Sequence, residues 1–295
     1  MDIAKQVCKK LEQLGYLHPA YGYKVSLKDL MVQDAVKQYQ DFYLIDLHNH
    51  AQSIYGRKMK ADGKVAMVTA NHLLTARTCG APDIQRASDG QVIAEANIPK
   101  TCRVDYKIYF DQGRWTSSLN LSKVRAKEIF AEALNEWNRN VGVRLSLTNT
   151  MGPAHTVAKW EKLSGSTLAW SHLANDSCAM NQEQRYDIRN WSEHMFYLVV
   201  LHEVGHLIGL PHRSGNYVMN PSIITSLETL TKNDITRARD LGYNGPLDPP
   251  PEDPYGPDTN YVKVFCKKKN GTTVSVSNVV SVSFASTPTD IKFDL

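Results

Sequence analysis

Long apolar runs are missing from this chain of 295 residues. A membrane-spanning helix needs about 18 to 20 consecutive apolar residues, and no stretch reaches that length. The opening segment MDIAKQVCKKLEQLGYL interleaves charges where a secretion signal would have an uninterrupted apolar core. We therefore expect no membrane insertion and no recognisable secretion signal.

Cysteine is also scarce. The five cysteines are too few and too scattered to form a disulfide framework, and an odd number leaves at least one thiol unpaired within the monomer. The remaining composition, 42% hydrophobic and 22% charged, is ordinary for a globular protein, and the length suits one or two domains. The cysteines are Cys8, Cys79, Cys102, Cys178 and Cys266.

An excess of charge of either sign is absent as well. The formal net charge is +4, and the one dense basic run, residues 267–269, stands beside the turn dipeptide Asn270-Gly271. A short run in that position is typical of a solvated hairpin end and not of a nucleic-acid interface. We expect no nucleic-acid partner.

Hydrophobic periodicity predicts a helical N-terminal part followed by a mixed part. Three short helices are expected before residue 80, and Gly15 is placed to end the first of them. Farther along, the patterns predict strands and helices, including a buried helix that Ser192 can cap. The predicted helices cover residues 2–14, 26–42, 69–76, 121–138, 192–207 and 231–241, and the predicted strands cover residues 103–110, 141–147 and 167–173.

A proline-rich segment, Pro246 to Pro257, marks a boundary near the C-terminal end. It reads PLDPPPEDPYGP, which favours an extended linker over packed structure. Beyond it, two runs rich in β-branched residues flank Asn270-Gly271, a strong hairpin signal. The sequence therefore predicts a small β-hairpin tail.

The string HEVGHLIGLPH, which begins at His202, has the spacing of a catalytic zinc site. On a helix, His202 and His206 lie on the same face one turn apart, so both imidazoles can reach one zinc ion. Gly209 can adopt the positive φ that ends the helix, and Pro211 prevents its continuation. The chain can then turn back and bring in His212 as the third ligand.

Three neutral protein ligands leave a fourth position for water, whose pKa a catalytic zinc lowers from about 15.7 to roughly 7. Glu203 stands next to the first ligand and can accept the proton of that water as general base. It can then deliver the proton to the leaving amine. The shorter pattern HExxH can arise by chance in a charged helix, but the added Gly209 and His212 make chance a poor explanation.

This string, together with the downstream segment NYVMNP, resembles the metzincin signature HExxHxxGxxH and its methionine turn. The spacing from His212 to Met219 is most similar to that of the matrixins, the matrix metalloproteinase family. In that family the methionine forms an apolar floor beneath the histidines, so Met219 is the expected equivalent, although a lone methionine is more often ordinary core. The resemblance implies an α+β metzincin domain with a mixed twisted sheet and an active-site helix.

Further matches extend the resemblance to the substrate cleft. It implies that Leu168 and Ala169 make main-chain contacts to an extended peptide, and that Pro221 to Ile224 form a pocket wall. The family often has tyrosine where this chain has Ile223, so pocket specificity does not carry over. The similar segments are VDYKI at 104–108, GSTLAW at 165–170 and LTKNDITRARDLGYNG at 230–245.

The segment RTCGAPDI, residues 77–84, resembles the cysteine switch PRCGVPDV of matrixin propeptides. A thiolate is a good fourth zinc ligand at about 2.3 Å, so Cys79 can displace the catalytic water and silence the enzyme. The alternative is a buried structural cysteine before a turn. The family arginine directly before the cysteine is Thr78 here, but an ion pair between Arg77 and Asp83 can still brace the loop.

Other matrixin metal sites are altered in this chain. LAW stands in place of LAH and RYD in place of HFD, so we expect the family's structural zinc site to be absent or rebuilt, and we nominate no histidine for it. Calcium binding by nearby acids has no further support in the sequence. The residues weighed for these sites are His155, His172, Asp176, Glu183 and Asp187.

Taken together, the sequence predicts a monomeric zinc metalloendopeptidase that is made as a latent zymogen, binds one catalytic zinc ion and hydrolyses protein or peptide substrates. The alternative is a catalytically silent metzincin-like binding protein, against which the presence of Glu203 argues. The family resemblance implies an extracellular enzyme, and a virus- or phage-encoded or non-classically released protein would account for the missing signal. The expected parts are a helical propeptide (1–84), a catalytic domain (85–245), a linker (246–258) and a hairpin tail (259–295).

Overall fold

The computed structural model divides into two compact units, Met1–Pro251 and Glu252–Leu295. The larger unit contains two separate hydrophobic cores, one built from its N-terminal helices and one from the sheet and helices after residue 105. No helix in the described part of the chain is long and apolar enough to span a bilayer. The structure describes residues 2–56, 58–86, 90, 92, 106–111, 120–151, 156–171 and 182–243, and the backbone of 264–267, 273–276 and 292–293.

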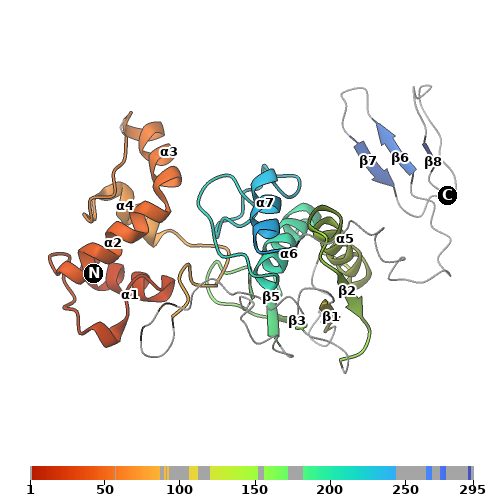
Figure 1. The fold of residues 1–295 in the computed structure, drawn as a ribbon, viewed down its shortest axis with the longest axis horizontal. Coiled ribbons are helices and arrows are strands. Elements are labelled where there is room, and N and C mark those ends of the chain that lie inside the picture. Colours follow the sequence, from red (N-terminus) through yellow and green to blue (C-terminus); the bar gives the residue numbers. More distant parts are fainter. Residues whose placement is uncertain are drawn as a thin grey trace. The chain divides into compact units, whose positions relative to one another are not determined.

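The N-terminal core contains four α-helices where the sequence predicts three. The additional helix escapes prediction because Leu47 and Ala51 are its only two buried residues, too few to give an apolar stripe. The second helix begins later than expected, because the Asp29 carboxylate, and not Ser26, caps it by accepting the N–H groups of Met31 and Val32. The helices are α1 (Ile3–Leu14), α2 (Leu30–Phe42), α3 (Leu44–Tyr55) and α4 (Met67–Leu74), with a 3₁₀ turn at Pro19–Tyr21 (Figure 1).

The second core is organised around a mixed five-stranded sheet in the order β2-β1-β3-β5-β4. All neighbouring strands are parallel except β4, which runs antiparallel to β5 and forms one edge. The expected α+β class is therefore confirmed. The strands are β1 (Tyr106–Phe110), β2 (Leu145–Thr148), β3 (Thr156–Glu161), β4 (Ala169–Ser171) and β5 (Gln182–Asp187).

Several strand predictions need correction. Strands β3 and β5 were not expected, because polar residues such as Thr156 and Gln184 occupy buried positions in them and hide the alternation. The segment expected as a strand from residue 141 begins only at Leu145, because the preceding helix continues to Val141. Strand β4 covers less than the expected residues 167–173, of which 172 and 173 lie outside the described residues. Residues 103–105 of the first expected strand also lie outside them.

Helices α5 (Lys123–Val141), α6 (Glu193–Leu207) and α7 (Lys232–Asp240) complete this core. The first two lie side by side (Figure 1), and the indole of Trp137 donates to the Leu201 carbonyl at 3.0 Å. As predicted, α6 is buried, and the Ser192 hydroxyl caps it by accepting the N–H of Met195 at 3.2 Å. Helix α5 and the sheet thus enclose α6 in the interior.

The described residues of the smaller unit form three short strands in the order β7-β6-β8, namely β6 (Val264–Lys267), β7 (Thr273–Val276) and β8 (Lys292–Phe293). Strands β6 and β7 are antiparallel, with Lys267 opposite Thr273. Its turn, Asn270-Gly271, and the proline-rich segment lie outside the described residues.

Candidate metal centre

Four potential metal ligands come together at the C-terminal end of α6. The ligand atoms of Cys79, His202, His206 and His212 all lie within 4.8 Å of one another, and all four residues are buried. Helix α6 supplies two of the histidines one turn apart. It ends as expected, since Gly209 has a φ of 99° and the chain then turns back until Nε2 of His212 lies 3.2 Å from Nε2 of His206.

The outer ring nitrogens of the two helical histidines point away from the cluster to backbone carbonyls. Nδ1 of His202 lies 2.7 Å from the Val218 carbonyl oxygen, and Nδ1 of His206 lies 2.8 Å from that of Leu210. A carbonyl can only accept, so each Nδ1 carries the proton and each Nε2 offers its lone pair to the cluster. Nε2 of His202 is buried without a hydrogen-bond partner among the described residues. An orphaned acceptor in this position fits a metal ligand.

The protonation of the three histidines also suits metal binding. Burial lowers the pKa of His202 to about 3 and that of His206 well below its usual range. Burial likewise lowers the pKa of His212, although the neighbouring Asp83 opposes the shift. All three imidazoles are therefore neutral near pH 7, which is the form that binds metal.

The thiol of Cys79 supplies the fourth donor. Its Sγ lies 3.6 Å from Nε2 of His206 and accepts the N–H of Ala81 at 3.4 Å. Cys79 and Cys8 are buried free thiols, while the other three cysteines lie outside the part whose side chains are described. Three imidazole nitrogens and one sulfur form a donor set typical of zinc, so the residues present fit the ion that the motif predicts.

Glu203 faces the same cluster. Its side chain is buried, one carboxylate oxygen has no hydrogen-bond partner among the described residues, and the carboxylate interacts with the thiol of Cys79. Burial raises the pKa of the Glu203 carboxyl well above its usual range. The backbone carbonyl of Glu203 accepts the side-chain amide of Gln184 from β5 at 3.0 Å. The sheet thus fixes the helix at the residue predicted to be the general base.

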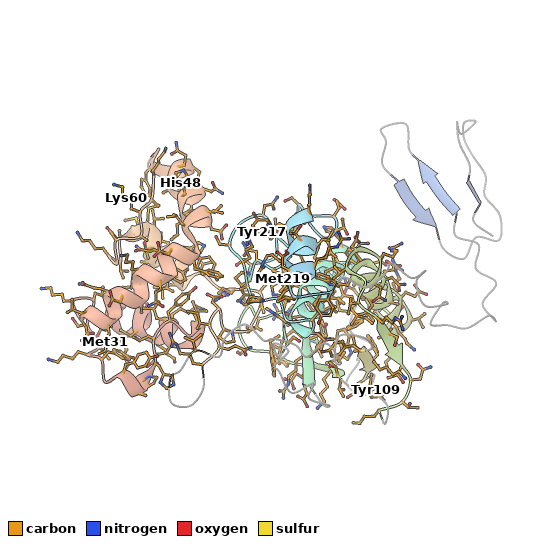
Figure 2. All side chains as sticks on the ribbon, viewed as in Figure 1. Met31, His48, Lys60, Tyr109, Tyr217 and Met219 are labelled. Atoms are coloured by element: carbon orange, nitrogen blue, oxygen red, sulfur yellow. The ribbon has the colours of Figure 1, made fainter. Side chains whose placement is uncertain are left out.

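The predicted methionine turn packs against α6. Met219 is fully buried, and a Cβ atom added to Gly205 would lie 2.3 Å from its sulfur, so only glycine permits this contact. The Asp234 carboxylate at the start of α7 accepts the N–H of Val218 at 3.1 Å and holds the turn. Figure 2 labels Met219 and, in the same turn, Tyr217. The role of Asp234 was missed, although its capping-box pattern with Thr231 is visible in the sequence.

Residues 77–84, the segment that resembles a cysteine switch and is called the switch segment below, run along the edge strand of the sheet. The Thr78 carbonyl accepts the N–H of Leu168 at 2.7 Å, and the N–H of Gly80 donates to the Ala169 carbonyl at 3.0 Å. Between them, Cys79 forms a parallel bridge with Ala169. The two residues predicted for main-chain substrate contacts therefore bind a peptide segment of the chain itself.

The opposite side of the same segment contacts the predicted pocket wall. The N–H of Cys79 donates to the Pro221 carbonyl at 2.9 Å. The Thr78 hydroxyl donates to that carbonyl at 2.8 Å and accepts the N–H of Ile223, also at 2.8 Å. No pattern in the sequence indicates that Thr78, which stands in place of the family's arginine, would bind the segment to the pocket wall.

The ion pair predicted between Arg77 and Asp83 is confirmed. The Asp83 carboxylate also accepts the hydroxyl of Tyr43 at 2.9 Å and lies 2.8 Å from Nδ1 of His212. Burial opposes ionisation of Asp83, but Arg77 and His212 outweigh it and lower its pKa to about 2. Asp83 is therefore a buried anion that touches a candidate metal ligand, a contact that sequence reasoning missed.

A second contact joins the N-terminal helices to the loop after the third histidine. The Asp46 carboxylate in the first turn of α3 accepts the Ser214 hydroxyl at 2.9 Å and the Gly215 N–H at 3.1 Å. The side-chain amide of Asn220 lies within 3.3 Å of the same carboxylate. No local pattern in the sequence indicated this interaction, because the partners are far apart along the chain.

The acids considered for calcium are paired with cations where the structure describes them. Glu183 forms ion pairs with Lys159 and Arg185. Asp187 pairs with Arg189 at 2.8 Å and also accepts the N–H of Leu163 at 2.6 Å. The remaining candidates for secondary metal sites, His155, His172 and Asp176, lie outside the described residues.

Comparison with known proteins agrees with this geometry. The sequence model of the matrixin family, peptidase family M10, matches residues 87–242, which is more than half of the chain and includes the three histidines and Glu203. No curated protein matches the chain in sequence. The matched region covers the mixed sheet, helices α5 to α7 and the methionine turn. The family model and the α+β fold together place this chain in the matrixin family of metallopeptidases.

Proposed function

We propose that this protein is a zinc-dependent metalloendopeptidase made as a latent zymogen. One observation carries the proposal, namely the convergence of three neutral imidazoles, the Cys79 thiol and the Glu203 carboxylate in one buried cluster. A purely structural zinc site has no use for a buried carboxylate beside its ligands. That carboxylate favours an enzyme over a catalytically silent binding protein.

His202, His206 and His212 would hold the zinc ion in both the latent and the active protein, and Cys79 would be a further ligand in the latent form. When bound, zinc supplies Lewis acidity that polarises a substrate carbonyl and makes water a better nucleophile near neutral pH. Matrixin membership supports zinc as the metal, and the N₃S donor set fits it.

Glu203 is the proposed general base. Its place beside the first histidine ligand allows the carboxylate to accept a proton from an attacking water and to hold it for the leaving amine. Gln184 binds the backbone carbonyl of Glu203, and Met219 packs against Gly205 of the same helix, so two contacts support the helix around the base. Such proton transfer contributes typically ~10²- to 10⁴-fold to a rate.

Substrate would bind as an extended peptide between the edge strand and the pocket wall. The main-chain groups of Leu168 and Ala169 on one side, and of Pro221 and Ile223 on the other, are the proposed contacts. The backbone of the switch segment binds Leu168, Ala169 and Pro221, which supports their ability to hold a peptide main chain, and the N–H of Ile223 donates to the Thr78 hydroxyl. Main-chain hydrogen bonds of this kind bind an extended peptide without depending on its side chains.

Latency follows from the same contacts. The switch segment fills the proposed substrate cleft while the Cys79 thiol occupies the metal cluster, so neither substrate nor water can take its working position. We propose residues 1–84 as the propeptide, 85–245 as the catalytic domain, 246–258 as a linker and 259–295 as a tail of unassigned role. An extracellular site of action and a monomeric state are part of this proposal, since matrixins are usually extracellular.

The proposal is tested by removing residues 1 to about 84 and assaying cleavage of gelatin, casein and a peptide library. The controls are Glu203→Ala in the same truncated chain and the addition of a chelator. We expect cleavage that both controls abolish. If the truncated chain retains zinc but shows no more cleavage than the truncated Glu203→Ala variant, the enzyme proposal fails and a binding function takes its place.

A further inference from the structure

The three candidate histidine ligands differ in the origin of their outer hydrogen-bond partners. His202 and His206 each use a backbone carbonyl from the catalytic part of the chain. His212 instead has its Nδ1 2.8 Å from the carboxylate of Asp83, which precedes it by 129 residues and belongs to the N-terminal segment. The third ligand is therefore oriented by a part of the chain that activation would remove.

Asp83 is held firmly enough to orient a ligand. Its side chain is fully buried, and it accepts hydrogen bonds from the Tyr43 hydroxyl and from the guanidinium of Arg77. Its backbone N–H donates to the Leu14 carbonyl at 3.0 Å, at the end of α1. Groups from α1, the end of α2 and the switch segment thus set the position of the carboxylate.

A carboxylate behind a metal-bound imidazole acts in two ways. It fixes the ring orientation and the tautomer, because the Nδ1–H donates to it, and it increases the electron density that Nε2 offers to the metal. Loss of such a partner typically lowers metal affinity by about 10- to 100-fold. This effect is separate from that of Cys79, which contributes a ligand of its own.

We propose that Asp83 is a positioning residue for the metal ligand His212, so that the N-terminal segment completes the metal centre as well as blocking it. The inference rests on the metal centre of the proposed function. Among the described residues, the other group within hydrogen-bond distance of the same nitrogen is Arg77, at 3.1 Å, and it belongs to the same segment. The latent chain therefore retains zinc more tightly than the chain without this segment, beyond the contribution of the thiol.

The test measures the zinc dissociation constant of full-length protein by competition with a chromogenic chelator. All variants carry Cys79→Ser, so that the thiol makes no contribution. We expect Asp83→Ala to weaken zinc binding by about 10- to 100-fold, and Asp83→Asn, which keeps an acceptor but loses the charge, to fall in between. The matched control is Asp46→Ala, which removes another carboxylate that joins the N-terminal helices to the catalytic part but touches none of the candidate ligands.

Cobalt substitution adds a second measurement, the visible spectrum of bound Co²⁺. This spectrum distinguishes loss of the contact with His212 from simple loosening of the segment. Asp83→Ala should alter the visible spectrum of bound Co²⁺, because the His212 ring is no longer fixed, whereas Asp46→Ala should leave it unchanged. Zinc affinity within threefold of the parent for Asp83→Ala, or an equal loss for Asp46→Ala, overturns the inference. If Asp83→Ala does not fold, the zinc affinity of Asp83→Asn is the deciding measurement. An unchanged affinity of that variant also overturns the inference.

These measurements need no substrate, so they separate the inference from the proposed function. A chain whose zinc affinity depends on Asp83 but which cleaves no peptide after activation supports the positioning role and refutes the protease. A chain that cleaves peptides but binds zinc independently of Asp83 supports the protease and refutes the positioning role.

Discussion

The sulfur of Cys79 lies 3.6 Å from Nε2 of His206, inside a cluster that also contains the other two histidines of the metal-binding string. The thiol is carried there by a segment whose backbone is hydrogen-bonded on both sides. Because the cysteine and the histidines belong to parts of the chain more than a hundred residues apart, their meeting ties the N-terminal helices to the proposed chemistry.

Replacement of the switch cysteine is the first prediction. Cys79→Ser in the full-length chain should give constitutive peptide cleavage, because a serine hydroxyl is a much poorer zinc ligand than a thiolate at neutral pH. The measurement is the rate of peptide cleavage before any activating treatment. Equal latency of the wild type and Cys79→Ser would mean that the backbone contacts alone block the cleft.

The contact of Asp46 with the loop after His212 gives the second prediction. Asp46→Ala should speed the appearance of activity after addition of a thiol reagent by about fivefold, since these half-exposed hydrogen bonds are worth about 1 kcal/mol. The control is Asp41→Ala, an exposed carboxylate near the end of α2. Identical activation rates for both variants would show that the Asp46 contact does not hold the segment.

The close approach of Gly205 and Met219 gives the third prediction. Gly205→Ala should destabilise the protein by about 1 to 3 kcal/mol, because the new methyl group collides with the buried sulfur. Thermal unfolding measures the loss. In the double variant with Met219→Ala the two effects should be less than additive, whereas strict additivity would contradict the proposed contact.

The ion pair of Asp187 and Arg189 gives a prediction on pH. Burial opposes ionisation of Asp187, but Arg189 and the Leu163 N–H lower its pKa below the usual value. The stabilisation is therefore fully present above the unfolded pKa of about 3.9 and is lost as the pH falls through the lower pKa of the folded state.

The variant Asp187→Asn should accordingly unfold more easily at pH 7 and should lose less stability than the wild type between pH 5 and pH 3. Denaturant unfolding at these pH values measures the difference. Glu228→Gln, at an exposed position, is the control. An Asp187→Asn protein with the same pH dependence as the wild type would contradict the assignment.

Features whose determinants lie within one short segment can be predicted from the sequence, whereas features that depend on contacts between distant residues cannot. Helix α6 and the meeting of its two histidines on one face are predictable from the sequence, because the cap at Ser192, the apolar run and the histidine spacing all lie within one short segment. Strand β5 is not, because it buries the polar Gln184, whose side chain is satisfied by Ser171, Tyr186 and the backbone of Glu203. The carboxylate of Asp83 behind His212 is likewise invisible, since no local pattern links residues so distant in the chain.

X-ray absorption spectroscopy at the zinc edge of the full-length, unactivated protein tests the proposed latent metal centre most directly. We expect zinc to be bound by one sulfur and three nitrogens, and the sulfur signal to disappear in Cys79→Ser while the nitrogen signals remain. A zinc ion with only nitrogen and oxygen ligands in the wild-type protein would contradict this proposal.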